Sequence, residues 1–327
     1  MRVVPAGVLA TLVLLVGCTA EDDGPGPSPG RTSPSREPTT TPPPTAPPTS
    51  EAPDRVDPDD VRAATAMAAV RHLAGVIGPR PGTTPAFFEA ADWVEARLVE
   101  LGWQVERQSF QVPAGFSGAG PTAGLPVEAG RSVNLVATRG DVVAGEPWLA
   151  AGAHLDTVPT SPGAEDNASG IGALLAVAEA TAERRTRLPV VLVAFGAEEP
   201  RGPGQDDHHY GSRAYVASLT TAERRSLRGM VAMDRVGVGT VVPVGSVAEP
   251  DPLRAQLLEA ADRIGVPTVA ETDQESSDHY SFVREGLPGV RLGSTSYAAY
   301  HSAQDVASVV DPAQLGRTAR LVVSWLR

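Results

Sequence analysis

The chain has 327 residues, of which 42% are hydrophobic, so it can bury a sizeable core. Acidic residues outnumber basic ones, 39 to 27, and the formal net charge is -12. This balance provides no basic face for nucleic acid or anionic lipid and argues against polyanionic partners.

Residues 1–18 have the pattern of an export signal. Arg2 is followed by the apolar run Val3–Val16, which is too short to span a bilayer comfortably. The sequence LVGC, ending at Cys18, resembles the bacterial lipobox, whose cysteine becomes lipidated after cleavage. We therefore expect an extracytoplasmic protein that touches the cell membrane only through a lipid on Cys18. An ordinary secretory signal that is cut elsewhere is the alternative.

Cys18 is the single cysteine, so an intrachain disulfide is impossible. Residues 19–58 are rich in Pro, Thr, Ser and Gly and contain few apolar residues. Such a segment cannot bury enough apolar surface to offset its chain entropy, which predicts a disordered linker. Residues 59–327 are then expected to form the folded domain.

Helical and strand patterns alternate along this domain. Apolar spacing predicts helices at 61–76, 87–102, 171–184, 252–264 and 312–326, with Gly102 as a C-terminal cap. Short apolar runs at 148–153, 190–195, 230–233 and 290–292 are typical of strands covered on both faces. This alternation predicts an α/β three-layer sandwich with a mostly parallel central sheet.

Polar residues follow directly on the predicted strands. Ligands of open α/β sheets bind outside the carboxyl ends of the strands, so these residues are expected to meet at one edge. Two histidines and several carboxylates gathered there would be costly unless a cation neutralised them, and the donor types suit zinc. The residues concerned are His154, Asp156, Asp166, Glu198, Glu199, Asp234, Tyr300 and His301.

The segments HLD, AEDNASG, GAEE, MDRVG and YHSAQD, in this order, resemble the M28 family of zinc peptidases. The short interval from His154 to Asp166 matches this family better than the related M20 group. The short interval from Asp234 to His301 leaves no room for the lid domain of M20 enzymes.

The resemblance implies a metallopeptidase that holds two Zn²⁺ ions per chain. His154 and Asp234 would bind one ion, Glu199 and His301 the other, and Asp166 would bridge them. Glu198 would be the general base that activates water, and Asp156 would orient His154 by accepting its second ring N–H. The Tyr300 hydroxyl would assist the developing oxyanion, although a packed aromatic residue is an equal alternative.

The remaining polar motifs receive lesser roles. Asp278 and His279, in SSDHYSF, are expected to position other groups, and His208 and His209 to shape the substrate rim. The leading hypothesis is a monomeric aminopeptidase that acts on peptides. A carboxypeptidase, a glutaminyl cyclase and a non-catalytic peptide-binding lipoprotein are the alternatives.

Overall fold

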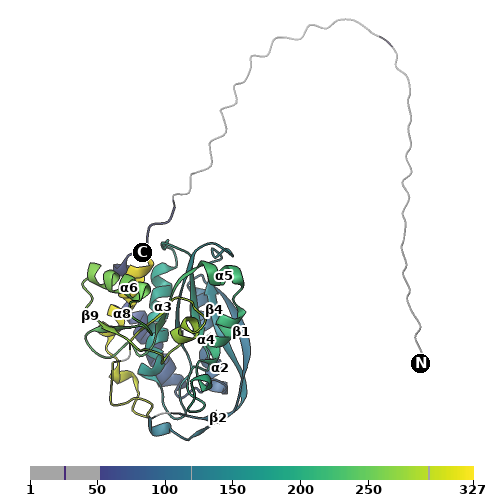
Figure 1. Ribbon diagram of the computed structural model, residues 1–327, viewed down its shortest axis with the longest axis vertical. Coiled ribbons are helices and arrows are strands. Elements are labelled where there is room, and N and C mark those ends of the chain that lie inside the picture. The colour runs from purple at the N-terminus through teal and green to yellow at the C-terminus, as the bar shows by residue number, and fades with distance from the viewer. Residues whose placement is uncertain (1–25, 27–51, 119, 294) are drawn as a thin grey trace. The chain divides into compact units, whose positions relative to one another are not determined.

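A computed structural model describes residue 26 and residues 52–118, 120–293 and 295–327 (Figure 1). The helices are η1 (Pro58–Asp60), α1 (Ala63–His72), η2 (Leu73–Ile77), α2 (Pro85–Glu100), η3 (Gly120–Thr122), η4 (Ala164–Ala168), α3 (Ser169–Thr181), η5 (Gln205–Asp207), α4 (Tyr210–Ser218), α5 (Thr221–Ser226), α6 (Pro252–Arg263), α7 (His279–Val283), η6 (Ala307–Val309) and α8 (Pro312–Leu326). The strands are β1 (Gln104–Val112), β2 (Gly115–Phe116), β3 (Pro126–Val127), β4 (Gly130–Thr138), β5 (Trp148–His154), β6 (Val190–Phe195), β7 (Leu227–Met233), β8 (Val242–Gly245), β9 (Thr268–Glu271) and β10 (Gly289–Leu292).

An 8-stranded sheet, in the order β1-β4-β6-β5-β7-β10-β8-β9, runs through the domain. Its four central strands, β6, β5, β7 and β10, are parallel to one another. β1, β4 and β8 add antiparallel pairings on the flanks, so the sheet is mixed. The parallel centre brings the carboxyl ends of β5, β6, β7 and β10 to one edge, as the sequence predicts.

Helices cover both faces of this sheet, which confirms the predicted three-layer α/β architecture. Along β6, Val190, Leu192 and Ala194 pack into a core that also contains side chains of α1, α2, α3, α6 and α8. The alternate residues Val191, Val193 and Phe195 pack on the opposite face, against α4 and α7. Side chains that alternate along a strand thus fill two separate cores, which explains why β6 is apolar throughout.

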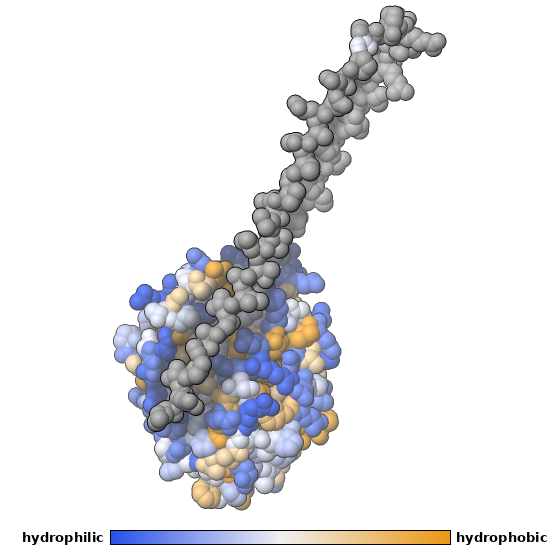
Figure 2. Space-filling model, turned by 90° about the vertical axis from the view of Figure 1, so that its right-hand side faces the viewer, coloured by the Kyte–Doolittle hydropathy of each residue, from blue (hydrophilic) through white to orange (hydrophobic). Residues whose placement is uncertain are grey.

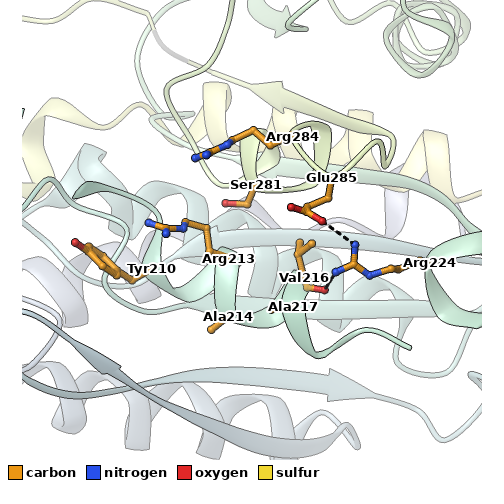
Figure 3. Close-up of a pocket in the computed structure, with 9 residues that line it drawn as sticks. All are labelled: Tyr210, Arg213, Ala214, Val216, Ala217, Arg224, Ser281, Arg284 and Glu285. Atoms are coloured by element: carbon orange, nitrogen blue, oxygen red, sulfur yellow. Dashed lines mark hydrogen bonds and ion pairs between the residues drawn. The ribbon is translucent and has the colours of Figure 1, made fainter. Parts of the chain in front are cut away.

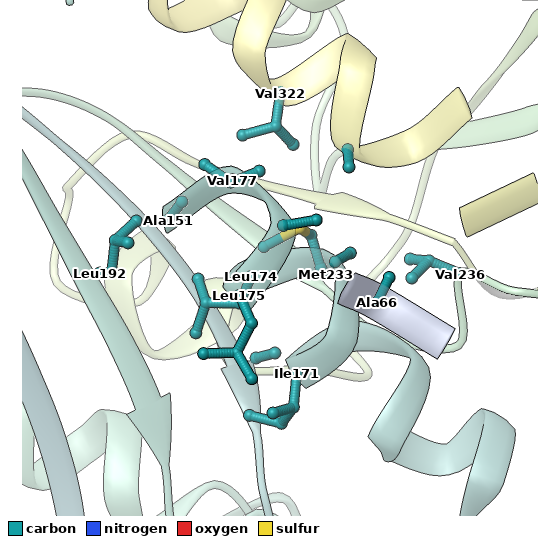
Figure 4. Packing of buried hydrophobic residues seen from close by; sticks show 14 of the residues in the cluster. Ala66, Ala151, Ile171, Leu174, Leu175, Val177, Leu192, Met233, Val236 and Val322 are labelled. Carbon is teal, nitrogen blue, oxygen red and sulfur yellow. The ribbon is translucent and has the colours of Figure 1, made fainter. Parts of the chain in front are cut away.

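Helix α3 lies at the centre of the larger core (Figure 4). Its side chains, including Leu174 and Val177, lie between the sheet residues Ala151 and Leu192 and Val322 of α8. Gly172 allows α1 to approach closely, because a Cβ atom there would lie 2.5 Å from the carbonyl oxygen of Ala66. The position of α3 fixes the loop before it, which carries Asp166.

The elements predicted from apolar spacing are all present: 190–195 and 312–326 keep their predicted bounds, and the others shift at one or both ends by one to three residues. The first predicted helix becomes α1 followed by the short helix η2. Helix α2 ends as expected, since Gly102 has φ +84 and its N–H donates to the carbonyl of Val99. The N–H of Trp103 donates to the carbonyl of Leu98, which completes a Schellman motif.

The folded domain begins a few residues before the predicted boundary at residue 59. Val56 is fully buried, and its N–H donates to the carbonyl of Arg185 over 3.0 Å. The predicted signal sequence and Cys18 lie outside the described residues. No helix in the described part of the chain is long and apolar enough to cross a membrane. On the face drawn in Figure 2, hydrophobic residues form small patches among hydrophilic ones.

Candidate metal centre

Three central strands deliver polar side chains to the same edge of the sheet. His154 is the last residue of β5, Glu198 and Glu199 follow β6 after a two-residue turn, and Asp234 follows β7. Ala197, in the turn, has φ +50, in the left-handed region. All four polar side chains are buried.

Asp166 reaches the same point from the loop before α3. The peptide bond between Asp166 and Asn167 is cis, and both residues have non-helical backbone angles. The buried carboxylate of Asp305 accepts the backbone N–H of Asp166 at 3.1 Å, and the Asn167 side chain donates to the carbonyl of Met233 at 2.9 Å. The first bond attaches the loop to the segment before η6, and the second attaches it to the end of β7. The Asn-Ala-Ser sequence here cannot serve as a glycosylation site in the folded chain, because Asn167 is buried.

Each oxygen of the Asp166 carboxylate lies near a different histidine. Oδ1 lies 3.3 Å from Nε2 of His154, and Oδ2 lies 3.2 Å from Nε2 of His301. His154 Nε2 is also 3.6 Å from Oδ1 of Asp234, and His301 Nε2 is 3.2 Å from Oε2 of Glu199. Asp166 therefore belongs to two groups of possible ligand atoms, one with His154 and Asp234 and the other with His301 and Glu199.

The spacing of these atoms fits two zinc sites. Bonds of 2.0–2.2 Å in tetrahedral geometry place neighbouring ligand atoms about 3.4 Å apart. The four distances that involve Asp166, Asp234 and Glu199 lie on either side of this value. Grouping by mutual distance alone places His154 in two sets, one with Asp166 and Glu199 and the other with Glu198 and Asp234. Glu198 Oε2, however, is farther from His154 Nε2, at 3.9 Å. The shorter contacts favour the expected division of ligands.

The electrostatics of the cluster also favour a cation. Glu199 Oε1 and Asp234 Oδ1 are buried and have no hydrogen-bond partner among the described residues. Burial, together with the neighbouring carboxylates, raises the pKa of both Glu198 and Glu199 to about 8, although His154 and His301 oppose this increase. Burial opposes charge on His301 too, but Glu199 and Asp166 raise its pKa to about 11. Buried acceptors that lack donors are typical of groups that bind metal.

Asp156 has a different contact from the one expected. The ring Nδ1 of His154 lies 3.2 Å from the backbone carbonyl oxygen of Asp156 and 3.6 Å from its Oδ1. The carboxylate instead accepts the backbone N–H groups of Glu198, at 3.0 Å, and Glu199, at 3.3 Å. The main chain of Asp156 thus orients the histidine, while its side chain fixes the turn that carries both glutamates.

Two arginines, which the sequence did not single out, flank Asp234. Buried Arg291, on β10, forms an ion pair with Oδ2 of Asp234 at 2.8 Å. Although burial opposes ionisation, the charge of Arg291 lowers the pKa of Asp234 well below its usual range. The guanidinium of Arg235 lies 4.6 Å from the ring centroid of Tyr300, whose ring stacks on His301. Arg235 lies in the segment MDRVG, in which only Asp234 was expected to act, and Arg291 lies in none of the expected motifs, so only the fold identifies their contacts.

The polar cluster opens into a cavity of about 580 Å³. Its walls include Tyr300, both His208 and His209, and the segment 273–276. Both histidines line the cavity, but only His208 is partly exposed, as a place at the rim requires; His209 is buried. Asp278 and His279 are fully buried and do not line this cavity. Their predicted positioning role stays a prediction.

A second cavity, of about 460 Å³, lies between α4 and α7 (Figure 3). Its lining includes Arg213, Arg224 and Arg284, and its carboxylate, Glu285, is paired with Arg224 at 3.1 Å. None of its described lining residues is a histidine. Its chemistry does not match that of a metal site.

Comparison with known proteins agrees with the geometry. The model of peptidase family M28 matches residues 134–326. The chain belongs to this family. Leupeptin-inactivating enzyme 1 of Streptomyces exfoliatus is 29% identical over 239 residues, which cover 71% of this chain and 49% of that protein. The uncharacterized protein YfbL of Escherichia coli is 25% identical over 299 residues, or 79% of this chain and 85% of that protein. This M28 chain therefore spans about half the length of the first of these relatives.

Solved structures share the M28 fold. A zinc aminopeptidase from Bacillus subtilis superposes with a TM-score of 0.71 at 18% identity, covering 81% of this chain and 94% of that one. A glutaminyl cyclase from Porphyromonas gingivalis superposes with a TM-score of 0.66 at 20% identity, covering 82% and 98%. One fold thus accommodates both activities, so the choice between them rests on the site.

Proposed function

We propose that this M28 protein is an aminopeptidase that holds two zinc ions and removes N-terminal residues from peptides. The observation that carries the proposal is the position of Asp166 between His154 and His301, with one carboxylate oxygen toward each ring. The two ions of such sites lie about 3.5–4 Å apart, a separation that one bridging carboxylate can span. Asp234 would complete the first site and Glu199 the second.

When bound, the two ions would lower the pKa of water and polarise the scissile carbonyl. Glu198 is the base: it takes a proton from the attacking water and delivers it to the departing amine as the C–N bond breaks. Asp156 holds the backbone of Glu198 in place. Tyr300 lies beside His301 on the cavity wall. Its hydroxyl donates a hydrogen bond to the carbonyl oxygen of the scissile bond as that oxygen gains negative charge.

The walls of the cavity favour a substrate with a free amino group. Asp273 and Glu275 add carboxylates beyond the metal ligands, whereas Arg235 is the one arginine among the described lining residues. A cationic N-terminus suits such a surface better than a C-terminal carboxylate does. The aminopeptidases among the relatives and structural neighbours support the same choice.

A panel of substrates tests this proposal. The full chain, with zinc, should hydrolyse aminoacyl p-nitroanilides and not their N-acetylated counterparts. Cyclisation of N-terminal glutamine without hydrolysis would instead identify a glutaminyl cyclase. Cleavage only at free carboxyl ends would identify a carboxypeptidase, and no turnover by the zinc-loaded chain would favour a binding protein.

The cellular location is part of the same proposal. Lipidation at Cys18 would place the enzyme on the outer face of the cell membrane, attached through the linker. Labelled fatty acid should be incorporated into the wild type and not into a Cys18→Ala variant. Incorporation that does not depend on Cys18 would contradict this assignment.

A further inference from the structure

His209 lies beside Glu198 because the chain returns to the site just before α4. The backbone N–H of His209 donates to the carbonyl of Glu198 at 2.9 Å, and that of Tyr210 donates to the carbonyl of Ala197 at 3.0 Å. His209 itself has φ +58, an uncommon value for a residue with a side chain. These backbone contacts fix the position of the ring relative to Glu198 without involving any proposed metal ligand.

The ring of His209 faces one particular oxygen of the glutamate. Its side chain is 3% exposed, and Nε2 lies 3.1 Å from Oε1 of Glu198. The other oxygen, Oε2, is the one that faces His154. Nε2 is not aligned well enough with Oε1 to count as a hydrogen bond. Hydrogen bonds of catalytic groups often become aligned only when the substrate is bound.

The histidine suits the role of a neutral donor. Burial lowers the pKa of His209 to about 4, so the ring is uncharged near neutral pH. A neutral imidazole carries one N–H, which can be on Nε2 and donate to a carboxylate. A neutral donor restrains the carboxylate without adding a charge that would compete with the metal ions.

We propose that His209 is a positioning residue that holds Oε1 of Glu198 and so keeps Oε2 turned toward the metal ligands. This role rests on the proposed function, in which Glu198 is the base. Without His209 the carboxylate could rotate about its last side-chain bonds, and the fraction of chains with Oε2 correctly placed would fall. The loss should therefore appear in the rate of the chemical step rather than in substrate binding.

The test compares three variants of the full chain on an aminoacyl p-nitroanilide. For His209→Ala we expect kcat to fall about 10- to 100-fold, which is typical when a residue that orients a functional side chain is removed. KM and zinc content should stay unchanged. His209→Gln should recover much of kcat, because its side-chain amide can donate to the same oxygen. His208→Ala removes the neighbouring ring, which lines the cavity but forms no hydrogen bond or ion pair with Glu198 in the described structure, so its effect should fall on KM.

Two results would overturn the role of His209. One is a His209→Ala enzyme whose kcat equals that of the wild type, and the other is a His209→Gln enzyme no better than His209→Ala. Both presuppose an active wild type, so they leave the proposed function intact. An inactive zinc-loaded wild type would refute the proposed function and this role with it.

Discussion

Arg291 and Asp234 form a buried ion pair, with 2.8 Å between a guanidinium nitrogen and Oδ2 of the carboxylate. The pair comes from neighbouring parallel strands, because Arg291 lies on β10 and Asp234 follows β7. Oδ1 of Asp234 faces Nε2 of His154 at 3.6 Å and lies 3.8 Å from Nε of Arg235. Under the proposed function, Oδ1 is the oxygen that would bind the metal, while Arg291 holds Oδ2.

Replacing Arg291 with Gln should therefore lower both the stability of the fold and the affinity for metal. Removing one partner of a buried pair leaves an uncompensated charge, for which we expect a loss of about 3–5 kcal/mol in the free energy of unfolding. Urea denaturation of the metal-free protein measures this change. Arg228→Gln is the matched control, since Arg228 is exposed on β7 and bonds only to backbone carbonyls in the described structure. Equal stability of the two variants would contradict the importance of the pair.

The adjacent glutamates should respond differently to the same substitution. Glu198→Gln removes the base, so kcat should fall about 10²- to 10⁴-fold while zinc content is retained. Glu199→Gln weakens a ligand, and we expect part of the zinc to be lost along with activity. Kinetics combined with metal analysis separate the two effects. A Glu198→Gln enzyme that keeps both zinc and activity would show that the base is another residue.

The Asp305 carboxylate should control metal affinity through the loop that carries Asp166. Its two oxygens accept the N–H groups of Glu165 and Asp166, and Oδ2 also accepts the hydroxyl of Tyr297. Asp305→Asn places an amide N–H against one of these donors, and we expect zinc affinity to fall about 10-fold or more. Tyr297→Phe removes a single bond and should have a smaller effect. The prediction fails if competition with a chelator gives equal affinities for Asp305→Asn and the wild type.

Tyr300→Phe measures what the phenol contributes. The substitution keeps the stacking on His301 but removes the hydroxyl, so zinc content should not change. Loss of one donor to a developing oxyanion typically costs about 10²-fold in kcat, and we expect a fall of this order. An unchanged kcat would mean that Tyr300 only packs against the histidine.

The metal-free protein should lose stability as the pH rises. Burial raises the pKa of Glu198 and Glu199 to about 8, above their value in the unfolded chain, so the folded state holds protons more tightly. Their contribution to stability is complete below the unfolded pKa near 4.5 and is lost as the pH rises through 8. Zinc should reverse this loss and release protons when it binds at pH 7. Thermal unfolding from pH 5.5 to 8.5, with zinc or with a chelator, tests the predicted direction of the change in stability with pH.

The sequence predicted the positions of the central strands and of the polar cluster because both depend on local patterns. Apolar runs such as Val190–Phe195 mark strands covered on both faces, and the acidic pair follows directly. β1 was not predicted, since it is mostly exposed, has few apolar residues, and its alternation is interrupted at residues 106 and 107. β4 was missed as well, because its burial is irregular along the strand.

Contacts that depend on tertiary structure could not be predicted. Arg291 looks like an ordinary strand residue until β10 pairs with β7. His209 was assigned to the rim of the site, and only the return of the chain to Glu198 reveals its second contact. For Asp156 the spacing from His154 was informative, but it could not distinguish the backbone carbonyl from the carboxylate.

The most direct test of the central claim is the number of zinc ions that activity requires. Metal-free full-length protein is titrated with zinc, while bound metal and hydrolysis of a free-amine substrate are measured in the same samples. We predict saturation at two zinc ions per chain, and Asp166→Ala should bind both more weakly. Full activity at one zinc ion per chain, or turnover that is unchanged in Asp166→Ala, would contradict the bridged two-metal site.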